Sequence, residues 1–148
     1  MLHQDWMQVA LREAQLAFEQ GEVPIGAVIV LNGQVIASAH NEREQKNDPT
    51  AHAEILVIQR AAKALGSWRL TDAILYVTLE PCPMCAGAIM QSRIKQLVYG
   101  AMDIKGGATG SVVNVLDYNL WNHRVDIVAG ILEDECLKIL KLFFKRLR

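Results

Sequence analysis

Two short and well-separated motifs place the strongest constraint on how this chain can fold. The first is His52-Ala53-Glu54, and the second is Pro81-Cys82-Pro83-Met84-Cys85. A catalytic zinc site uses three protein ligands, commonly His and Cys, and keeps a fourth position open for water. His52, Cys82 and Cys85 supply that number of ligands, so we expect the fold to bring the two motifs together.

The spacing within each motif predicts where two helices begin. Cys82 and Cys85 are three residues apart, so both sulfurs lie on one side of a helix that starts there. His52 and Glu54 are two residues apart and would point away from each other in mid-helix. Both can face one ion only if it lies near the helix end, so we expect a helix to start at or near His52. Thiolates at such positions are favoured by the positive end of the helix dipole.

Glu54 has a different expected role from the three ligands. A neutral histidine, two thiolates and a dication carry a total charge of about zero, so this ion should acidify a bound water less strongly than an ion held by three histidines. A helper base is therefore needed. Glu54 lies beside the ligands without being the obvious fourth one, which suits it to accept the proton of the water and pass it on.

The two motifs are also compatible with sites that are not catalytic. A Cys-x-x-Cys pair can be a redox centre, but a redox centre gives no reason for the first motif. A structural zinc site prefers a fourth Cys or His; Cys136 is one candidate, although it lies on the apolar face of the last predicted helix and is expected in the core. A non-catalytic zinc-stabilised binding module is a further alternative, against which Glu54 argues, because burying an unused carboxylate beside a metal is costly.

Apolar periodicity predicts an α/β fold in one domain, residues 1–148. Helices are expected over 5–19, from about 52 to 65, from 83 toward 92 and over 132–148, and strands over 25–31, 34–39, 73–79, 96–101 and 124–128. The Asn32-Gly33 pair predicts a two-residue hairpin turn between the first two strands. Helices that alternate with buried strands predict a three-layer α/β/α sandwich around a five-stranded mixed sheet, whose strand order this pattern does not determine.

Composition narrows the class of protein. With 51% hydrophobic and 21% charged residues, the 148-residue chain is typical of a globular domain. We find no apolar run long enough for a membrane span and no secretory signal, so we expect no membrane association and a cytoplasmic location. A net charge of −1 does not indicate a nucleic-acid partner, but residues 136–148 contain five cations and no acid. These cations are Lys138, Lys141, Lys145, Arg146 and Arg148.

Longer stretches around the motifs resemble one known family. Residues 48–54 (Asp-Pro-Thr-Ala-His-Ala-Glu), 78–88 (Thr-Leu-Glu-Pro-Cys-Pro-Met-Cys-Ala-Gly-Ala) and 122–125 (Asn-His-Arg-Val) are similar to the bacterial tRNA adenosine deaminases. The metal motifs alone indicate only the cytidine-deaminase-like zinc deaminase superfamily. The flanking residues, the loop 103–108 and the basic last helix carry the narrower resemblance, which covers nearly the whole chain.

The resemblance implies an activity and a cofactor. The family are hydrolases that convert adenosine to inosine at the first anticodon (wobble) position of tRNA. One Zn2+ per chain, held by His52, Cys82 and Cys85, would carry a hydroxide that attacks the adenine carbon bearing the amino group. Glu54 would act as the proton shuttle, protonating the ring nitrogen and then the leaving amine.

The same resemblance implies partners and substrate contacts. It predicts a homodimer that binds the anticodon loop of tRNA. Asn41 matches the family's pocket amide that contacts the target nucleoside. Asp103, Lys105 and Phe144 match family positions near the anticodon loop.

A deaminase of a free nucleobase or nucleoside, of the guanine or cytosine type, is the nearest alternative, because it would use the same zinc site. The basic last helix favours an RNA substrate, since a small molecule has no use for it. Binding of RNA also weakens steeply as salt rises, whereas activity on a small molecule should depend only weakly on salt.

Overall fold

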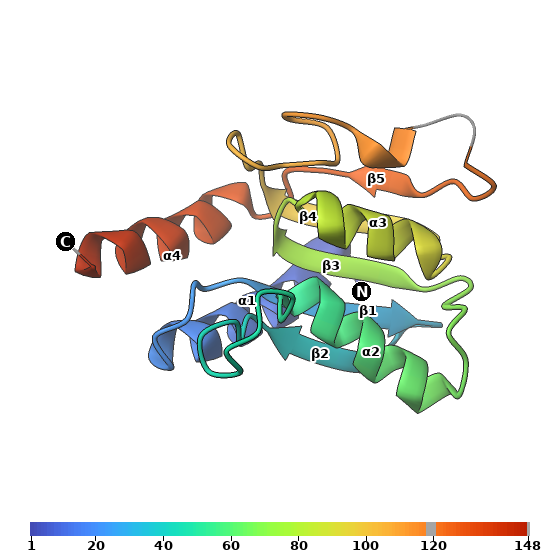
Figure 1. Ribbon diagram of the computed structural model, residues 1–148, viewed down its shortest axis with the longest axis horizontal. Helices are drawn as coiled ribbons and strands as arrows, with labels where there is room; N and C mark the ends of the chain where they lie inside the picture. The colour runs from blue at the N-terminus through green and yellow to red at the C-terminus, as the bar shows by residue number, and fades with distance from the viewer. Residues whose placement is uncertain (118–120, 148) are drawn as a thin grey trace.

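The computed structural model, which describes residues 1–117 and 121–147, is built around one five-stranded sheet (Figure 1). The strand order is β2-β1-β3-β4-β5. β1 is antiparallel to β2 and to β3, whereas β3, β4 and β5 are parallel, so the predicted mixed sheet is confirmed. The strands are β1 (Gly26–Leu31), β2 (Gln34–His40), β3 (Ile74–Leu79), β4 (Gln96–Ala101) and β5 (Asp126–Val128).

Helices cover both faces of the sheet, which confirms the predicted three-layer α/β/α sandwich. Helices α2 and α3 lie side by side over one face, and α1 and α4 pack on the other (Figure 1). The helices are α1 (His3–Glu19), α2 (Ala53–Leu65), α3 (Pro83–Gln91) and α4 (Glu133–Arg146), with a short 3-10 helix η1 (Val115–Asp117). No helix within the described residues is long and apolar enough to cross a bilayer.

The sheet separates two hydrophobic cores, and β3 contributes to both. Successive side chains of a strand point to opposite faces. Leu75 and Val77 accordingly pack into the core beneath α2 and α3, while Tyr76 packs into the core beneath α1 and α4. Cys136 is fully buried in that second core, as predicted.

The turn residues behave as the sequence indicates. Asn32 and Gly33 both have positive φ, 51° and 73°, as a two-residue hairpin turn requires. Gly66 ends α2 in the left-handed conformation, with φ 65°. These residues fix where β1 and α2 end.

Some predicted element boundaries are wrong by a few residues. The fifth strand begins at Asp126, not at residue 124, because its partner β4 begins at Gln96, which pairs with Asp126. The first helix begins at His3, two residues earlier than predicted, where the Asp5 carboxylate accepts a hydrogen bond from the Leu2 N–H at 2.7 Å. The last helix spans 133–146, and Arg148, counted among the basic residues, lies outside the described residues.

The candidate site lies where parallel strands end. β3 leads through Glu80 and Pro81 into α3, and β4 leads into a loop, residues 102–113. Helix α2 also begins at this edge of the sheet (Figure 1). In open α/β sheets, ligands bind in the crevice beyond the carboxyl ends of the strands.

Candidate metal centre and active site

Backbone conformation at two helix starts explains how the motifs meet. His52 is the N-cap of α2 and has an extended backbone, with φ −76° and ψ 152°. Because His52 is not yet helical, its side chain can point toward the same place as the side chain of Glu54. Cys82 is likewise the extended N-cap of α3, with Pro83 at the first helical position. The predicted helix starts are confirmed at both motifs.

The three expected ligands converge. His52 Nδ1 lies 3.5 Å from Cys85 Sγ and 3.7 Å from Cys82 Sγ, and a donor atom from each residue lies within 4.8 Å of the others. With bond lengths of about 2.05 Å to nitrogen and about 2.3 Å to sulfur, a tetrahedral zinc ion holds N and S ligands about 3.6 Å apart. The donor set therefore fits zinc in both chemistry and spacing.

One of the two cysteine ligands keeps a proton that a metal ion would displace. Hydrogen bonds from Cys85 and from the His52 ring lower the pKa of Cys82 to about 4, so Cys82 is a thiolate at neutral pH. The pKa of Cys85 is raised by the hydrogen bond between Cys85 and Cys82 and by burial. A thiolate is the form in which cysteine ligates metal, and ligation of the second sulfur releases its proton.

Glu54 lies beside the ligands in the first turn of α2 and is only 4% exposed. Cys85 Sγ lies within hydrogen-bond reach of its carboxylate. Burial raises the pKa of Glu54 to about 7. A buried carboxylate next to a ligand, in a pocket, is a group that can both take up and release a proton near neutral pH.

A small pocket of about 90 Å³ opens beside the ligands. Asn41 and Arg43 line it together with His52, and Val23, Ile25 and Ala53 supply the remaining wall. The Asn41 side chain is held in place, because its Oδ1 accepts a hydrogen bond from the Arg43 N–H at 3.1 Å and its Nδ2 donates to Val23 O at 3.4 Å. An amide carries two N–H donors and two acceptor lone pairs, so capacity remains for a ligand.

The other expected contact residues lie outside this pocket. Asp103 and Lys105 are on the loop after β4, where the Asp103 carboxylate accepts hydrogen bonds from the N–H groups of Lys105 and Gly106, both at 3.1 Å. Lys105 is exposed. Phe144 is 47% exposed on α4 and contacts Phe143 edge to face. The residues that line the pocket in the described part of the chain include none of these three.

Three residues near the site were not singled out from the sequence. Arg43 borders the pocket. Glu22 and Glu80 are buried carboxylates that accept backbone hydrogen bonds, Glu22 from the loop before α2 and Glu80 from the loop after β4. Burial would raise the pKa of Glu80, but hydrogen bonds from Ser111 and from backbone N–H groups lower it below its ordinary value. A charged residue directly after an apolar strand was the one signal available for Glu80.

A larger cavity, about 490 Å³, lies beside β5 and η1. His123 lines it, and its Nε2 bonds to Ile94 O at 2.7 Å. None of the metal ligands borders this cavity. We take the smaller pocket as the candidate active site, because His52 and the Asn41 amide both line it and Glu54 lies two residues from His52.

The chain matches known proteins both as a family and as individual relatives. All of it, residues 1–148, matches the family model of the MafB19-like deaminases. A relative from Bacillus subtilis (strain 168), named tRNA-specific adenosine deaminase, is 55% identical over 143 residues, which cover 97% of this chain and 89% of the relative.

Solved structures share the fold. One, from work on A-to-I editing by tRNA:A34 deaminases at the wobble position of transfer RNA, has a TM-score of 0.89 and 52% identity, and covers 92% of this chain and 99% of its own. The guanine deaminase of Bacillus subtilis has a TM-score of 0.66 and 36% identity, over 81% of this chain and 87% of its own.

Proposed function

This chain belongs to the MafB19-like deaminase family and, within it, to the tRNA-specific adenosine deaminases, and from that premise we propose that it converts adenosine to inosine at the first anticodon position of a transfer RNA. The observation that carries the proposal is the meeting of His52, Cys82 and Cys85 beside the buried Glu54. The overall reaction takes adenosine and water to inosine and ammonia.

His52, Cys82 and Cys85 would hold the zinc ion. When bound, the ion would lower the pKa of a water molecule and so make it a better nucleophile near neutral pH. Two helix N-termini converge on these ligands, and their positive dipole ends stabilise the two thiolates.

Glu54 moves the protons of the reaction. Its carboxylate accepts a proton from the attacking water and delivers it to ring nitrogen N1 of adenine. It then carries the second proton of the water to the amine that leaves as ammonia. Burial excludes bulk water from this carboxylate, so the proton passes to the substrate rather than to solvent.

Other residues position the substrate. The remaining N–H and lone pair of the Asn41 amide would bind the target nucleoside in the pocket. Asp103, Lys105 and Phe144 would contact the anticodon loop, whose unstacked bases can be splayed out at little cost. A tRNA substrate also supports the proposed cytoplasmic location.

We further propose that the enzyme is a homodimer. Met84 is 38% exposed on the outer face of α3, and Gly87 and Ala88 on the same helix are half-buried. Met102 and Ile104 on the neighbouring loop are 46% and 79% exposed. Exposed apolar side chains such as Met84, Met102 and Ile104 are of the kind that association covers. A molecular mass in solution equal to one chain at working concentration would overturn this part of the proposal.

Deamination of a free base is the second candidate function. The guanine deaminase of Bacillus subtilis, which is named for a free base, shares the fold at 36% identity. The basic face of α4 favours RNA, because Lys138, Lys141 and Lys145 are all exposed.

Side-by-side turnover separates the two functions. The zinc-loaded protein is incubated with an anticodon stem-loop that bears adenosine at its first anticodon position, and in parallel with free adenosine, guanine and cytosine. We expect kcat/KM to be high for the stem-loop alone. Equal or higher kcat/KM for a free base would favour the second candidate.

A further inference from the structure

Glu80 is a buried carboxylate that the proposed chemistry does not use. It follows the last residue of β3, is 2% exposed and is not one of the metal ligands. Its side chain accepts three backbone hydrogen bonds: Oε1 from Asp103 N–H at 3.1 Å, and Oε2 from Thr109 N–H at 3.0 Å and from Ser111 N–H at 3.1 Å. Buried charge is stable in a protein only when it is bonded in this way.

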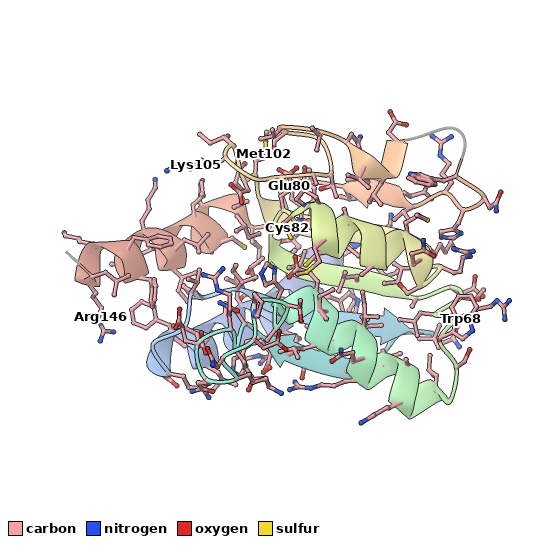
Figure 2. All side chains as sticks on the ribbon, in the orientation of Figure 1. Trp68, Glu80, Cys82, Met102, Lys105 and Arg146 are labelled. Atoms are coloured by element: carbon pink, nitrogen blue, oxygen red, sulfur yellow. The ribbon has the colours of Figure 1, made fainter. Side chains whose placement is uncertain are left out.

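All three donors belong to the loop that follows β4. The loop closes around the Glu80 side chain, and Gly107 is what lets it approach: a Cβ at that position would lie 2.4 Å from the carboxyl carbon of Glu80. In Figure 2, Glu80 lies between Cys82 and the part of the loop from Met102 to Lys105. The carboxylate is therefore the centre around which this loop is folded.

The same carboxylate is tied to the metal-ligand segment. Glu80 is two residues before Cys82, and its own N–H donates to Ala101 O at 2.8 Å. The loop is bonded to the segment a second time, where the Ala108 N–H donates to Pro81 O at 2.9 Å. Residues 80–82 thus include the metal ligand Cys82 and also the two residues that are hydrogen-bonded to the loop.

We propose that Glu80 is a positioning residue for the RNA substrate, which fixes the loop carrying Asp103 and Lys105 at a set distance from the metal centre. The inference rests on the proposed function, in which that loop contacts the anticodon loop. Glu80 touches neither substrate nor metal. Its effect is to pre-organise the surface that the RNA must match while the target base is in the pocket.

The test compares Glu80→Ala and Glu80→Gln with the wild-type protein. Glu80→Ala leaves three N–H groups, one buried and two part-buried, without an acceptor, so we expect KM for the anticodon stem-loop to rise about tenfold. We expect kcat to stay within about twofold, because Glu54 and the ligands are untouched. Glu80→Gln keeps an acceptor oxygen, so its KM should lie between those of the wild type and Glu80→Ala.

A destabilised control distinguishes positioning from a general loss of stability. Met7→Ala opens a cavity in the core on the opposite face of the sheet, where Met7 is fully buried. It should lower Tm at least as much as Glu80→Ala does, yet leave KM unchanged. Zinc content is measured in every variant and should remain one per chain.

A second measurement does not depend on activity. Amide hydrogen exchange should be faster at Asp103, Thr109 and Ser111 in Glu80→Ala than in the wild type, and unchanged at these positions in Met7→Ala. An unchanged KM in Glu80→Ala, or a fall in kcat accompanied by loss of zinc, would overturn the positioning role. If the wild type makes no inosine from the stem-loop, the proposed function fails instead, while the exchange rates still report whether Glu80 anchors the loop.

Discussion

At position 52 the backbone is extended where the next residue begins a helix, and this local conformation assembles the site. Because His52 is the N-cap, its ring turns toward Cys82 and Cys85 while Glu54, in the first turn, reaches the same place from the helix itself. A His-x-Glu pair in mid-helix could not do this. The roles proposed for the four residues rest on position: three contribute donor atoms to one cluster, and the fourth lies beside it.

Removing Glu54 should separate metal binding from chemistry. In Glu54→Ala we expect zinc to remain at one ion per chain, because the three donors are intact, while kcat falls by about 10²–10⁴-fold, the usual contribution of a general acid and base. Metal analysis and single-turnover kinetics check both. Cys85→Ala is the matched variant that should lose zinc, and loss of zinc in Glu54→Ala would make Glu54 a ligand.

Tyr76 gives a prediction about alkaline pH that does not involve the metal site. Tyr76 is 1% exposed and shares a hydrogen bond of 2.8 Å with His3, and burial raises its pKa from 10 to about 12. Folding thus favours the protonated phenol, so the stability that it contributes is complete below about pH 10 and is lost as pH rises toward 12.

Unfolding midpoints at rising pH test this behaviour, with Tyr76→Phe for comparison. At pH 8 the wild type should be the more stable protein by about 1 kcal/mol, the net value of one hydrogen bond. The difference should shrink and then reverse between pH 10 and 12. A constant difference across that range would mean that Tyr76 titrates normally in the folded protein.

At the scale of elements, α1 packs very close against the start of β1. Gly26 begins β1 beneath α1, and a Cβ there would lie 2.0 Å from Ala10 O and 2.5 Å from Ala14 N. These are backbone atoms in mid-helix, so the helix as a whole would have to move. Because glycine has no side chain, Gly26 allows α1 to lie this close to the sheet.

Gly26→Ala should therefore destabilise the protein strongly. We expect a loss of about 3 kcal/mol or more in the free energy of unfolding, since neither element can yield locally. Gln8→Ala is a suitable control, because Gln8 is exposed on the same helix, α1, and alanine favours helix. Urea unfolding of both variants measures the difference, and similar losses in the two would show that the close approach at Gly26 is not what matters.

Most elements could be predicted from the sequence, because their signals are local. Asn32-Gly33 and Gly66 mark ends by their backbone preferences, and the spacing of Cys82 and Cys85 marks a helix start. The start of β5 could not be read in this way, since pairing with β4 decides it. Strand order could not be predicted either, because the apolar sequence of a buried strand does not indicate which strands lie next to it.

The site was only partly predictable for the same reason. His52, Glu54 and the two cysteines form a pattern in the sequence, so their meeting could be foreseen. The roles of Glu22 and Glu80 depend on backbone N–H groups of distant loops, which lie 22 to 31 positions further along the chain. Backbone donors have no side-chain signature, so no spacing of residue types reveals them.

At the scale of the whole molecule, the site and the basic surface lie at one end. Two helix N-termini and the loop after β4 meet at the carboxyl edge of the parallel strands, and α4 runs out beyond that end of the sheet (Figure 1). Figure 2 places Lys105 and Arg146 toward this end and Trp68 at the other. An RNA hairpin entering the pocket by its loop would meet the cations of α4 with its backbone.

Salt should affect the RNA reaction in a way that reports these contacts. If Lys138, Lys141, Lys145 and Arg146 each neutralise one phosphate, log kcat/KM falls with log salt at a slope of about −3, or about fiftyfold between about 50 and about 200 mM. Replacing Lys141 and Lys145 with Gln should make the slope shallower by about 1.4. A slope that stays the same in this double variant would exclude those two lysines from RNA contact.

The most direct test of the proposed activity is formation of inosine in a synthetic anticodon stem-loop with adenosine at its first anticodon position. The zinc-loaded protein and its Glu54→Gln variant are incubated with it side by side, and the nucleosides are identified after digestion. We predict inosine at that position with the wild type and none above background with Glu54→Gln. Inosine from both proteins would contradict the role of Glu54, and none from either, with zinc bound, would contradict the proposed substrate.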